Sequence, residues 1–565
     1  MLTLAVGGLF ATYATLLVGW HVLRRHLLRT VVGVDDIGLL AKERREGDKI
    51  DGTAVVCGGR WCWSNDSLSL LIIYSIAGML AARICHAHFK KVLIIEPDKW
   101  TTSDEARTLK EWNHEPRRTR VLQYTSLHGN QAFLFESLIP LFPKFLAAAA
   151  DARISILPHD PLFSSSGGLW RVPAAARRPL AYTSRATLER LIRCVVLDKT
   201  SYPNIEYMVG TVTDATPDPQ DPTRLGHVVV RTEQGSAENI PAALVLDCTG
   251  TARAGMKWLG RHGYGAWEGK TIDHLKIALD QKLRYSTLIF KLGSRGDKFF
   301  DSLPIPHAFQ AIKPILTFVE DANEVTLRRG RSLVVLLRTD VDTLFAFTGC
   351  YGDARAQPKN VDELLAYMHG LYTVEPIPDW IFEFVDRLRE IEHTSLLSLV
   401  KVPPTTYVRY HLAENLPSNF VALGDSVMTV NPIFGEGCTK AMRCAMALHT
   451  TLFSAQKTSN TIPSTFSKDF FKLERQRTEY VWGEHSHPSS DYGALTTVPI
   501  EGESIAEGWF PRWYASKLQQ LAIRDEKAGE AIYQTVAGFG TPIDALHPHL
   551  IAKVVWTALT GKNNS

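Results

Sequence analysis

Five residues in the first hundred have the characters needed to bind a dinucleotide. Gly58, Gly59, Ser75 and Gly78 are small, and Glu96 follows an apolar run. Small residues let the backbone of a turn approach a pyrophosphate at a helix N-terminus, and an acidic residue after the next strand accepts a hydrogen bond from a ribose hydroxyl. These residue types therefore predict a dinucleotide site.

The elements that would hold these residues follow from the surrounding pattern. Apolar runs at residues 53–57 and 92–95 predict two buried strands, and residues 76–89 predict a helix between them. A strand, a glycine turn, a helix and a second strand with an acidic end form a βαβ unit. The expected fold class is therefore α/β (α+β), with a Rossmann-like dinucleotide-binding domain.

The glycine turn is interrupted by residues 60–74, which read RWCWSNDSLSLLIIY. Without them the text is TAVVCGGSIAGM, and Glu96 follows Gly58 at about the 20-residue spacing of such sites. We interpret the interruption as a retained intron, because codons for Arg60–Trp61 can contain a GT donor and those for Tyr74–Ser75 an AG acceptor. A natural insertion is the alternative, since loops lengthen at small entropic cost.

A second glycine-rich segment, FVALGDSVMTVNPIFGEGCTKA, covers residues 420–441. A buried-strand pattern leads to Asp425, and Pro432, Gly435 and Gly437 precede a helical pattern. A carboxylate at this place can accept from a ribitol hydroxyl, and backbone N–H groups at the helix start stabilise negative charge at the N1–O2 edge of a flavin. Together with the first turn, this segment predicts FAD as the cofactor.

With these motifs, the chain resembles the FAD-dependent monooxygenase superfamily of squalene epoxidases, aromatic hydroxylases and flavin halogenases. It looks closest to the membrane-anchored FAD monooxygenases of fungal natural-product pathways. The resemblance covers residues 51–455 and also rests on RTRVLQYTSLHG, TSRATLERLIR and LDCTG. It implies that Arg120 and Arg185 contact the cofactor, and that Gln123 and His128 belong to the same pattern as Arg120.

The segment LDCTG, at residues 246–250, departs from the Asp-Gly motif of family members that bind NADPH directly. NADPH and a separate reductase partner therefore both stay open as electron sources. Trp61 and Trp63 match only the first half of the halogenase W-x-W-x-I-P motif and lie inside the interruption. Halogenation is therefore not indicated.

Residues 2–23 (LTLAVGGLFATYATLLVGWHVL) carry no charged side chain, and Arg24, Arg25 and Arg29 follow them. As a helix with a rise of 1.5 Å per residue they would reach about 33 Å, enough to cross a hydrocarbon core. The positive-inside rule then leaves the rest of the chain in the cytosol. We expect a single-pass anchor at residues 1–28 in the endoplasmic reticulum membrane; a buried core helix is the alternative.

The remaining pattern divides the chain into further parts. The expected parts are the transmembrane anchor at 1–28, a linker at 29–50, the FAD-binding domain at 51–255 and 401–460, a mainly substrate-binding domain with a second sheet at 256–400, and a helical C-terminal region at 461–565. Aromatic residues that could line an apolar substrate pocket are Tyr285, Phe290, Phe345, Phe347 and Tyr351. The C-terminal region either covers the active site or contacts the membrane.

Composition excludes several other classes of function. A net charge of +3 over 565 residues gives no reason to expect a nucleic-acid partner. The eight cysteines are scattered without a C-x-x-C pair, which favours reduced thiols in a cytosol-facing protein. His86 and His88 are two residues apart on a predicted helix, a spacing that does not put two ligands on one face. We therefore expect no metal site.

The predicted function is an FAD-dependent monooxygenase that uses O₂ to epoxidise or hydroxylate a lipophilic small-molecule substrate. A terpenoid- or polyketide-type intermediate of secondary metabolism would suit a membrane tether. The sequence contains no paired carboxylates and names no general acid or base, so the catalytic residues stay unassigned. The alternatives are an FAD-dependent reductase, dehydrogenase or cyclase on the same fold, and a flavin-free membrane-associated scaffold.

Overall fold

The computed structural model describes most of the chain. The described residues are 2–59, 76–104, 106, 124–158, 162–165, 168–293, 296–306, 317–320, 330–340, 342–352, 355–373, 375–455, 460–482, 492 and 494–560. The interruption at residues 60–74, together with Ser75, Arg120 and Gln123, lies outside them.

A seven-stranded sheet forms the centre of the first domain, in the order β18-β10-β1-β2-β7-β8-β9. The first five strands are parallel, and β8 and β9 are antiparallel additions at one edge. The strands are β1 (Ile50–Cys57), β2 (Phe89–Glu96), β7 (Ile205–Pro217), β8 (Leu225–Thr232), β9 (Ala237–Pro241), β10 (Leu244–Asp247) and β18 (Phe420–Ala422).

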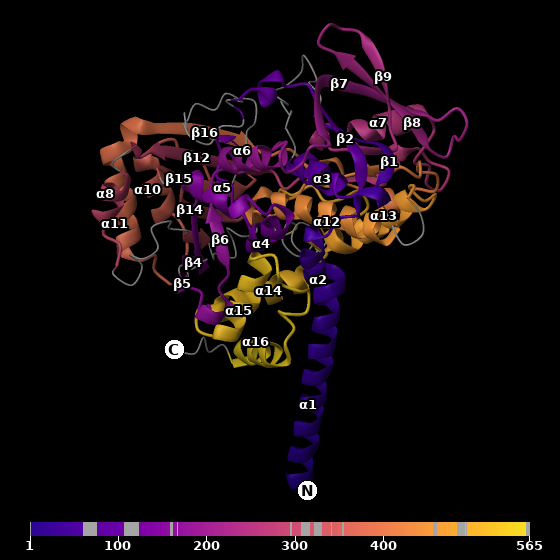
Figure 1. The fold of residues 1–565 in the computed structure, drawn as a ribbon. Helices are drawn as coiled ribbons and strands as arrows, with labels where there is room; N and C mark the ends of the chain where they lie inside the picture. Colours follow the sequence, from indigo (N-terminus) through magenta and orange to yellow (C-terminus); the bar gives the residue numbers. More distant parts are fainter. Residues whose placement is uncertain are drawn as a thin grey trace.

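The predicted βαβ unit is present as β1, α3 (Ile76–His86) and β2, with β1 and β2 parallel. The middle of β1 is apolar because both faces of the parallel sheet are covered, and Ala54, Val55 and Val56 are buried. The long helix α12 (Gly437–Ala455) packs against α3 on one side and against α13 (Phe466–Tyr480) on the other. Two segments from opposite ends of the sequence thus build one domain (Figure 1).

A second seven-stranded sheet, in the order β16-β12-β15-β14-β13-β4-β5, lies beside the first domain (Figure 1). Its strands are antiparallel except for the parallel pair β13 and β4. They are β4 (Leu162–Ser165), β5 (Gly168–Leu169), β12 (Leu283–Lys291), β13 (Thr317–Glu320), β14 (Ser332–Thr339), β15 (Thr343–Tyr351) and β16 (Ser395–Lys401). One face packs against α10 (Val361–His369) and α11 (Asp379–Arg387), and the opposite face looks toward the first domain.

Shorter elements complete the two domains. Two small antiparallel sheets pair β3 (Ser155–Pro158) with β6 (Pro179–Tyr182), and β11 (Lys276–Leu279) with β17 (Thr405–Val408). The remaining helices are α2 (Val34–Ile37), α4 (Ala132–Leu141), α5 (Phe145–Asp151), α6 (Arg185–Val196), α7 (Ala254–Arg261) and α8 (Gly296–Asp301).

The segment predicted as a linker, residues 29–50, lies partly against the body. The guanidinium of Arg477 on α13 holds the Asp36 carboxylate at 2.5 Å. Arg44 is buried and donates to the imidazole of His88 and, at 2.8 Å, to the carbonyl of Leu452 at the end of α12. These contacts fix the chain between the N-terminal helix and β1.

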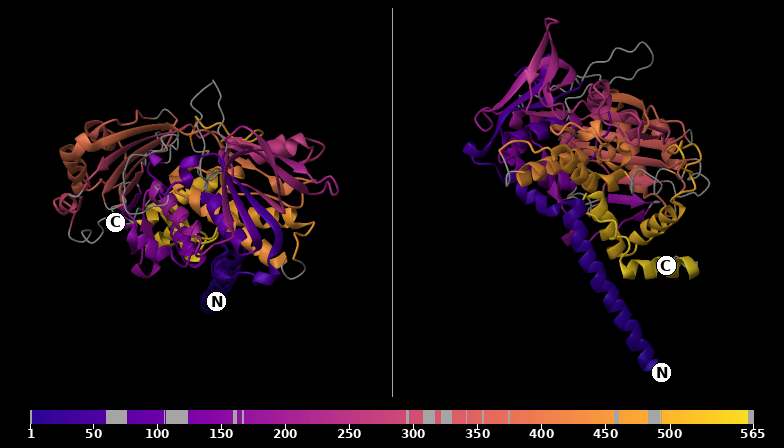
Figure 2. Two further views of the ribbon diagram at one scale, coloured as in Figure 1. Left: turned by 45° about the horizontal axis from the view of Figure 1, so that its top comes forward. Right: turned by 90° about the vertical axis from the view of Figure 1, so that its right-hand side faces the viewer.

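The N-terminal helix α1 (Leu2–Leu27) projects away from the body (Figures 1 and 2). Within the described part of the chain, no single helix is both long and apolar enough to cross a membrane. The helix pair α4 and α5 passes the same length and composition test together, but it bends by 113°. The predicted helix at the N-terminus is therefore present, and its role as a transmembrane anchor is not confirmed.

The C-terminal region is helical, as predicted. Its helices α14 (Trp509–Ala522), α15 (Glu526–Val536) and α16 (Pro548–Thr560) form a small cluster with a core of their own. This cluster sits beneath the two sheets, beside the base of α1 (Figure 1).

Candidate cofactor and substrate site

The carboxyl ends of β1 and β2 meet as the dinucleotide motif requires. The backbone N–H of Gly58 donates to the carbonyl of Ile95 at 2.8 Å, and Glu96 is buried at the end of β2. A methyl group on Gly58 would lie 2.3 Å from Oε2 of Glu96 and 2.9 Å from the backbone oxygen of Ile95, so a larger residue would displace both. The predicted turn residue and the predicted ribose acceptor are therefore neighbours.

Gly59 and Gly78 lie on either side of residues 60–75, which are outside the described part of the chain. Gly59 is buried immediately after β1, and Gly78 lies in the first turn of α3. A Cβ on Gly78 would sit 3.4 Å from the Cβ of Cys248, which follows β10. This is an ordinary van der Waals distance, so the packing of α3 against the strands would also accept an alanine at position 78. These residues fit a bound dinucleotide such as FAD.

Asp247, in the LDCTG segment, ties the neighbouring strand ends together. One carboxylate oxygen accepts from the backbone N–H (2.9 Å) and hydroxyl (2.6 Å) of Thr249 and from Ser426 (3.1 Å). The other oxygen accepts from the backbone N–H of Gly255 at 2.9 Å. Burial raises the pKa of Asp247, although these hydrogen bonds act in the opposite direction. The motif therefore has a structural role that links β10 to the turn after β18.

Asp425 lies in that turn and forms an ion pair. The ammonium of Lys440, itself fully buried on α12, is 2.6 Å from Oδ1 of Asp425 and also donates to the carbonyl of Met428. Burial alone would raise the pKa of Asp425, but the positive charge of Lys440 holds it below its usual range. Asp425 is therefore an ionised acceptor at the sheet edge, as its predicted role requires. Sequence reasoning missed Lys440, although its position within a glycine-opened helix was visible.

The glycine segment before α12 touches a second loop. Pro432 begins a short 3₁₀ turn, Gly435 has φ +65°, and α12 starts at Gly437. A Cβ on Gly435 would be 3.2 Å from the carbonyl oxygen of Gly129. Glycine is thus needed at position 435 both for its backbone conformation and for this close approach.

Arg185 extends the site to the start of α12. It is the first residue of α6, which Ser184 caps by accepting from the N–H of Thr187. Its guanidinium is buried and lies 3.1 Å from the sulfur of Cys438 and 3.5 Å from the carboxylate of Glu189. The positive charge adds to the N-terminal dipole of α12, so an anionic group bound there would be stabilised.

His128 completes this cluster. Its Nε2 lies 3.3 Å from the sulfur of Cys438. Burial and the nearby charge of Arg185 lower the pKa of His128 to about 3, so its imidazole is neutral near pH 7. Burial likewise raises the pKa of the Cys438 thiol. The sequence did not predict a role for Cys438, because the residues that contact it lie far away in the chain.

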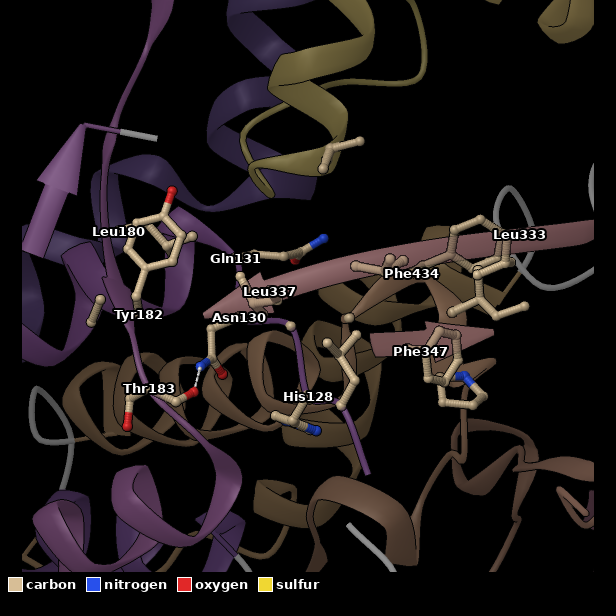
Figure 3. Close-up of a pocket in the computed structure, with 18 of the residues that line it drawn as sticks. His128, Asn130, Gln131, Leu180, Tyr182, Thr183, Leu333, Leu337, Phe347 and Phe434 are labelled. Carbon is tan, nitrogen blue, oxygen red and sulfur yellow. Dashed lines mark hydrogen bonds between the residues drawn. The ribbon is translucent and has the colours of Figure 1, made fainter. Parts of the chain in front are cut away.

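A cavity of about 130 Å³ lies between these loops and the second sheet (Figure 3). Its walls come from the 127–131 loop, residues 432–435, strands β6, β12, β14 and β15, and Val536 at the end of α15. Figure 3 shows Asn130 donating to the carbonyl of Thr183, at 3.5 Å, among mostly apolar side chains. The volume suits the reacting end of a ligand rather than a whole drug-sized molecule.

The aromatic residues predicted for this pocket divide between two faces of the sheet. Tyr285 and Phe347 line the cavity. Phe290 was wrongly assigned, because strand alternation turns it to the opposite face, where it packs with α10 and α11. Phe345 shares the face of Phe347 but does not reach the cavity, and the hydroxyl of Tyr351 instead accepts from Asn431 at 2.7 Å.

The second sheet is fixed to the first domain by another residue that sequence reasoning missed. Asp340, in the hairpin between β14 and β15, has φ +52°. Its carboxylate accepts from the backbone N–H of Ser184 (3.0 Å) and the hydroxyl of Thr183 (3.1 Å), just before α6. These hydrogen bonds therefore fix the position of the substrate-facing strands relative to the helix that carries Arg185.

These elements, a mainly parallel sheet joined to a second sheet with a cavity between them, form the fold of a flavoprotein. The chain is similar over 91% of its length to the whole of a flavoprotein/dehydrogenase from Cytophaga hutchinsonii, with a TM-score of 0.50 and 13% identity. It also aligns, with 12% identity and a TM-score of 0.48, to 99% of the flavin-dependent brominase Bmp2, over 89% of this chain.

Among curated proteins, Protein Rv3254 of Mycobacterium tuberculosis is 24% identical over 460 residues, which is 79% of this chain and 83% of that protein. No family model matches the chain. The predicted flavoprotein fold is therefore confirmed. Membership of the FAD-dependent monooxygenase superfamily belongs to the proposed function. The further likeness to membrane-anchored fungal enzymes stays a prediction.

Proposed function

We propose that this chain is an FAD-dependent monooxygenase that epoxidises or hydroxylates a lipophilic terpenoid- or polyketide-type intermediate of secondary metabolism. The observation that carries the proposal is the apolar cavity beside the predicted flavin segment, bounded by the glycine turn at residues 432–435 and by the second sheet. A substrate held there would face the predicted cofactor segment and be screened from water.

The residues that would hold FAD have separate tasks. Gly58, Gly59 and Gly78 admit the pyrophosphate turn, Glu96 accepts from the ribose, and Asp425 accepts from the ribitol. Backbone N–H groups at the start of α12, reinforced by Arg185, stabilise negative charge on the flavin ring. When bound and reduced, FAD supplies the chemistry that activates O₂ for transfer of one oxygen atom.

The protein's other tasks are positioning and exclusion of water. Leu180, Leu337 and Val536 narrow the cavity with apolar side chains, while Asn130 offers an amide at its polar side. Neutral His128 leaves the cluster at Cys438 without a second buried positive charge. NADPH or a reductase partner would deliver electrons, and lipophilic substrates would suit attachment to the cytosolic face of the endoplasmic reticulum.

The proposal is tested first by the visible absorption spectrum of the purified protein, with and without residues 60–74. We expect flavin bands near one per chain in at least one of the two forms. Turnover under ¹⁸O₂ should then place one labelled oxygen atom in the product. Flavin bound to protein whose product carries no label would instead indicate a reductase, dehydrogenase or cyclase. Folded protein without flavin in either form would refute the cofactor assignment.

A further inference from the structure

Helix α16 has an unusual distribution of side chains for a surface helix. Leu550 and Val554 point inward and are each 1% exposed. The outward positions are also apolar: Ile551 is 40% exposed, Val555 46%, Trp556 62% and Leu559 80%. A surface helix of a globular protein normally packs its apolar face on the core and presents a polar face to water. The outward face of α16 therefore calls for an apolar partner.

Helix α16 carries little charge. Its one charged residue is Lys553, whose ammonium pairs with Asp525 at the start of α15. The remaining exposed positions of the helix are alanines and the terminal Thr560. Lys553 nevertheless remains 44% exposed, and Trp556 lines a cavity with Lys517 and Arg524, so charged groups border the outward face on the side of α14.

Two further exposed aromatic side chains lie on α14, which shares a buried core with α16. Trp509 and Phe510, in the first turn of α14, are 66% and 53% exposed, and their rings contact each other edge to face. We call the set Trp509, Phe510, Ile551, Val555, Trp556 and Leu559 the C-terminal apolar surface. Single exposed apolar residues are common on proteins, but a set of this size on neighbouring helices marks an interaction site.

Helix α1 lies next to this surface. The indole N–H of Trp20 donates to the carbonyl of Ile543 at 2.8 Å, and Arg24 pairs with Asp544 at 2.6 Å, in the turn before α16. Figures 1 and 2 show α1 leaving the body at this place while α16 runs across its direction. The two helices are therefore held at one end of the molecule.

The exposed side chains of α1 show what kind of partner this end requires. Leu16, Val18 and Val22 are 56%, 64% and 66% exposed. At 3.6 residues per turn, Val18 and Val22 share one side of the helix, whereas Leu16 lies roughly opposite Val18. A protein partner would cover one stripe of a helix, whereas apolar residues on several sides need an apolar environment all round. Hydrocarbon chains of lipids provide that environment.

We propose that the C-terminal apolar surface rests on a phospholipid membrane, with α16 lying in the boundary between headgroups and acyl chains beside α1. Tryptophans prefer this boundary, because the ring is apolar and the N–H is polar. Arg25, exposed where α1 meets the body, would face lipid phosphates. The inference rests on the membrane attachment within the proposed function and adds a second contact, made by α14 and α16.

The test places an environment-sensitive fluorophore on the full-length protein at one of three exposed positions. Leu559→Cys probes α16, Val18→Cys probes α1, and Leu399→Cys on β16, 51% exposed, is the matched control on the opposite part of the molecule. Most described native cysteines are buried, and wild-type protein carried through the labelling gives the background. The probe surface is a vesicle of phosphatidylcholine with phosphatidylserine.

We expect vesicles to shift the emission at position 559 to the blue and to raise it severalfold, with quenching by lipids brominated on their acyl chains. The signal at position 399 should stay unchanged. A response at position 18 without one at 559 would overturn the proposal while leaving membrane attachment intact. Silence at both positions would overturn both. A blue-shifted signal at 559 without vesicles that grows with protein concentration would show that a second copy covers this surface, and would also overturn the proposal.

Discussion

Glu474 offers a quantitative test of how the cofactor domain is packed. It lies on α13, is 2% exposed, and faces α12. Its Oε1 accepts from the hydroxyl of Thr478 at 2.7 Å and from the thiol of Cys444 at 3.7 Å. Burial raises the pKa of this carboxyl from 4.5 to about 7, and the hydrogen bonds offset only part of the shift.

The sign of the pH dependence follows from this shift. Between pH 4.5 and 7 the folded protein keeps the proton on Glu474 while the unfolded chain has released it. The stability that the protonated group contributes is therefore complete below the unfolded pKa and is lost as the pH rises through the folded one. At 1.36 kcal/mol per pKa unit, the loss is about 3 kcal/mol.

Glu474→Gln removes the titration while keeping an amide oxygen for both donors. We expect the variant to gain about 2–3 kcal/mol relative to wild type between pH 5 and pH 8, measured by urea unfolding followed by circular dichroism. Glu479→Gln, on the same helix but 42% exposed and paired with Arg475, is the control and should change stability by less than about 1 kcal/mol at either pH. A pH-independent difference between wild type and Glu474→Gln would refute the reasoning.

Three further outcomes follow from the site. Gly58→Ala should lower bound FAD at least tenfold with circular dichroism unchanged, because its methyl group would meet Oε2 of Glu96 at 2.3 Å; absorbance near 450 nm measures this, and normal flavin content would contradict it. Asp247→Asn should cost about 2–3 kcal/mol in urea unfolding, since an amide N–H would face the N–H of Gly255 or the donors opposite; a loss below about 0.5 kcal/mol would contradict it. Val536→Trp should fill the cavity and raise KM at least tenfold in substrate-stimulated oxygen uptake, with flavin content unchanged; unchanged KM would show that the substrate binds elsewhere.

Much of the fold could be predicted from local pattern. The strands β1 and β2 and the helix α3 follow from apolar runs and glycines within about 50 residues, and their predicted order is observed. The turn and helix start between Asp425 and Gly437 could also be predicted, because glycine and proline impose their own backbone geometry. Such features are encoded over short distances and need no knowledge of distant partners.

The aromatic residues of the second sheet were harder to assign. The sequence places Tyr285 and Phe290 on one strand, but the face that each occupies depends on which side of the sheet receives helices. In the structure α10 and α11 take the side of Phe290, and the cavity forms on the side of Tyr285. Alternation was therefore predictable, whereas the identity of the cavity side was not.

The sequence by itself determined the βαβ unit, the acidic end of β2 and the glycine-rich entry into α12, because each is set by neighbouring residues. Only the tertiary structure brought Arg185 to Cys438, Lys440 to Asp425 and Val536 to the cavity wall. The structure also shows that one apolar face of α16 is solvent-exposed, whereas its composition alone would predict an ordinary buried helix. The physical reason is that burial and charge pairing depend on which surfaces pack together. The same apolar helical pattern is compatible with a protein core and with a lipid boundary, and only its neighbours in space distinguish the two.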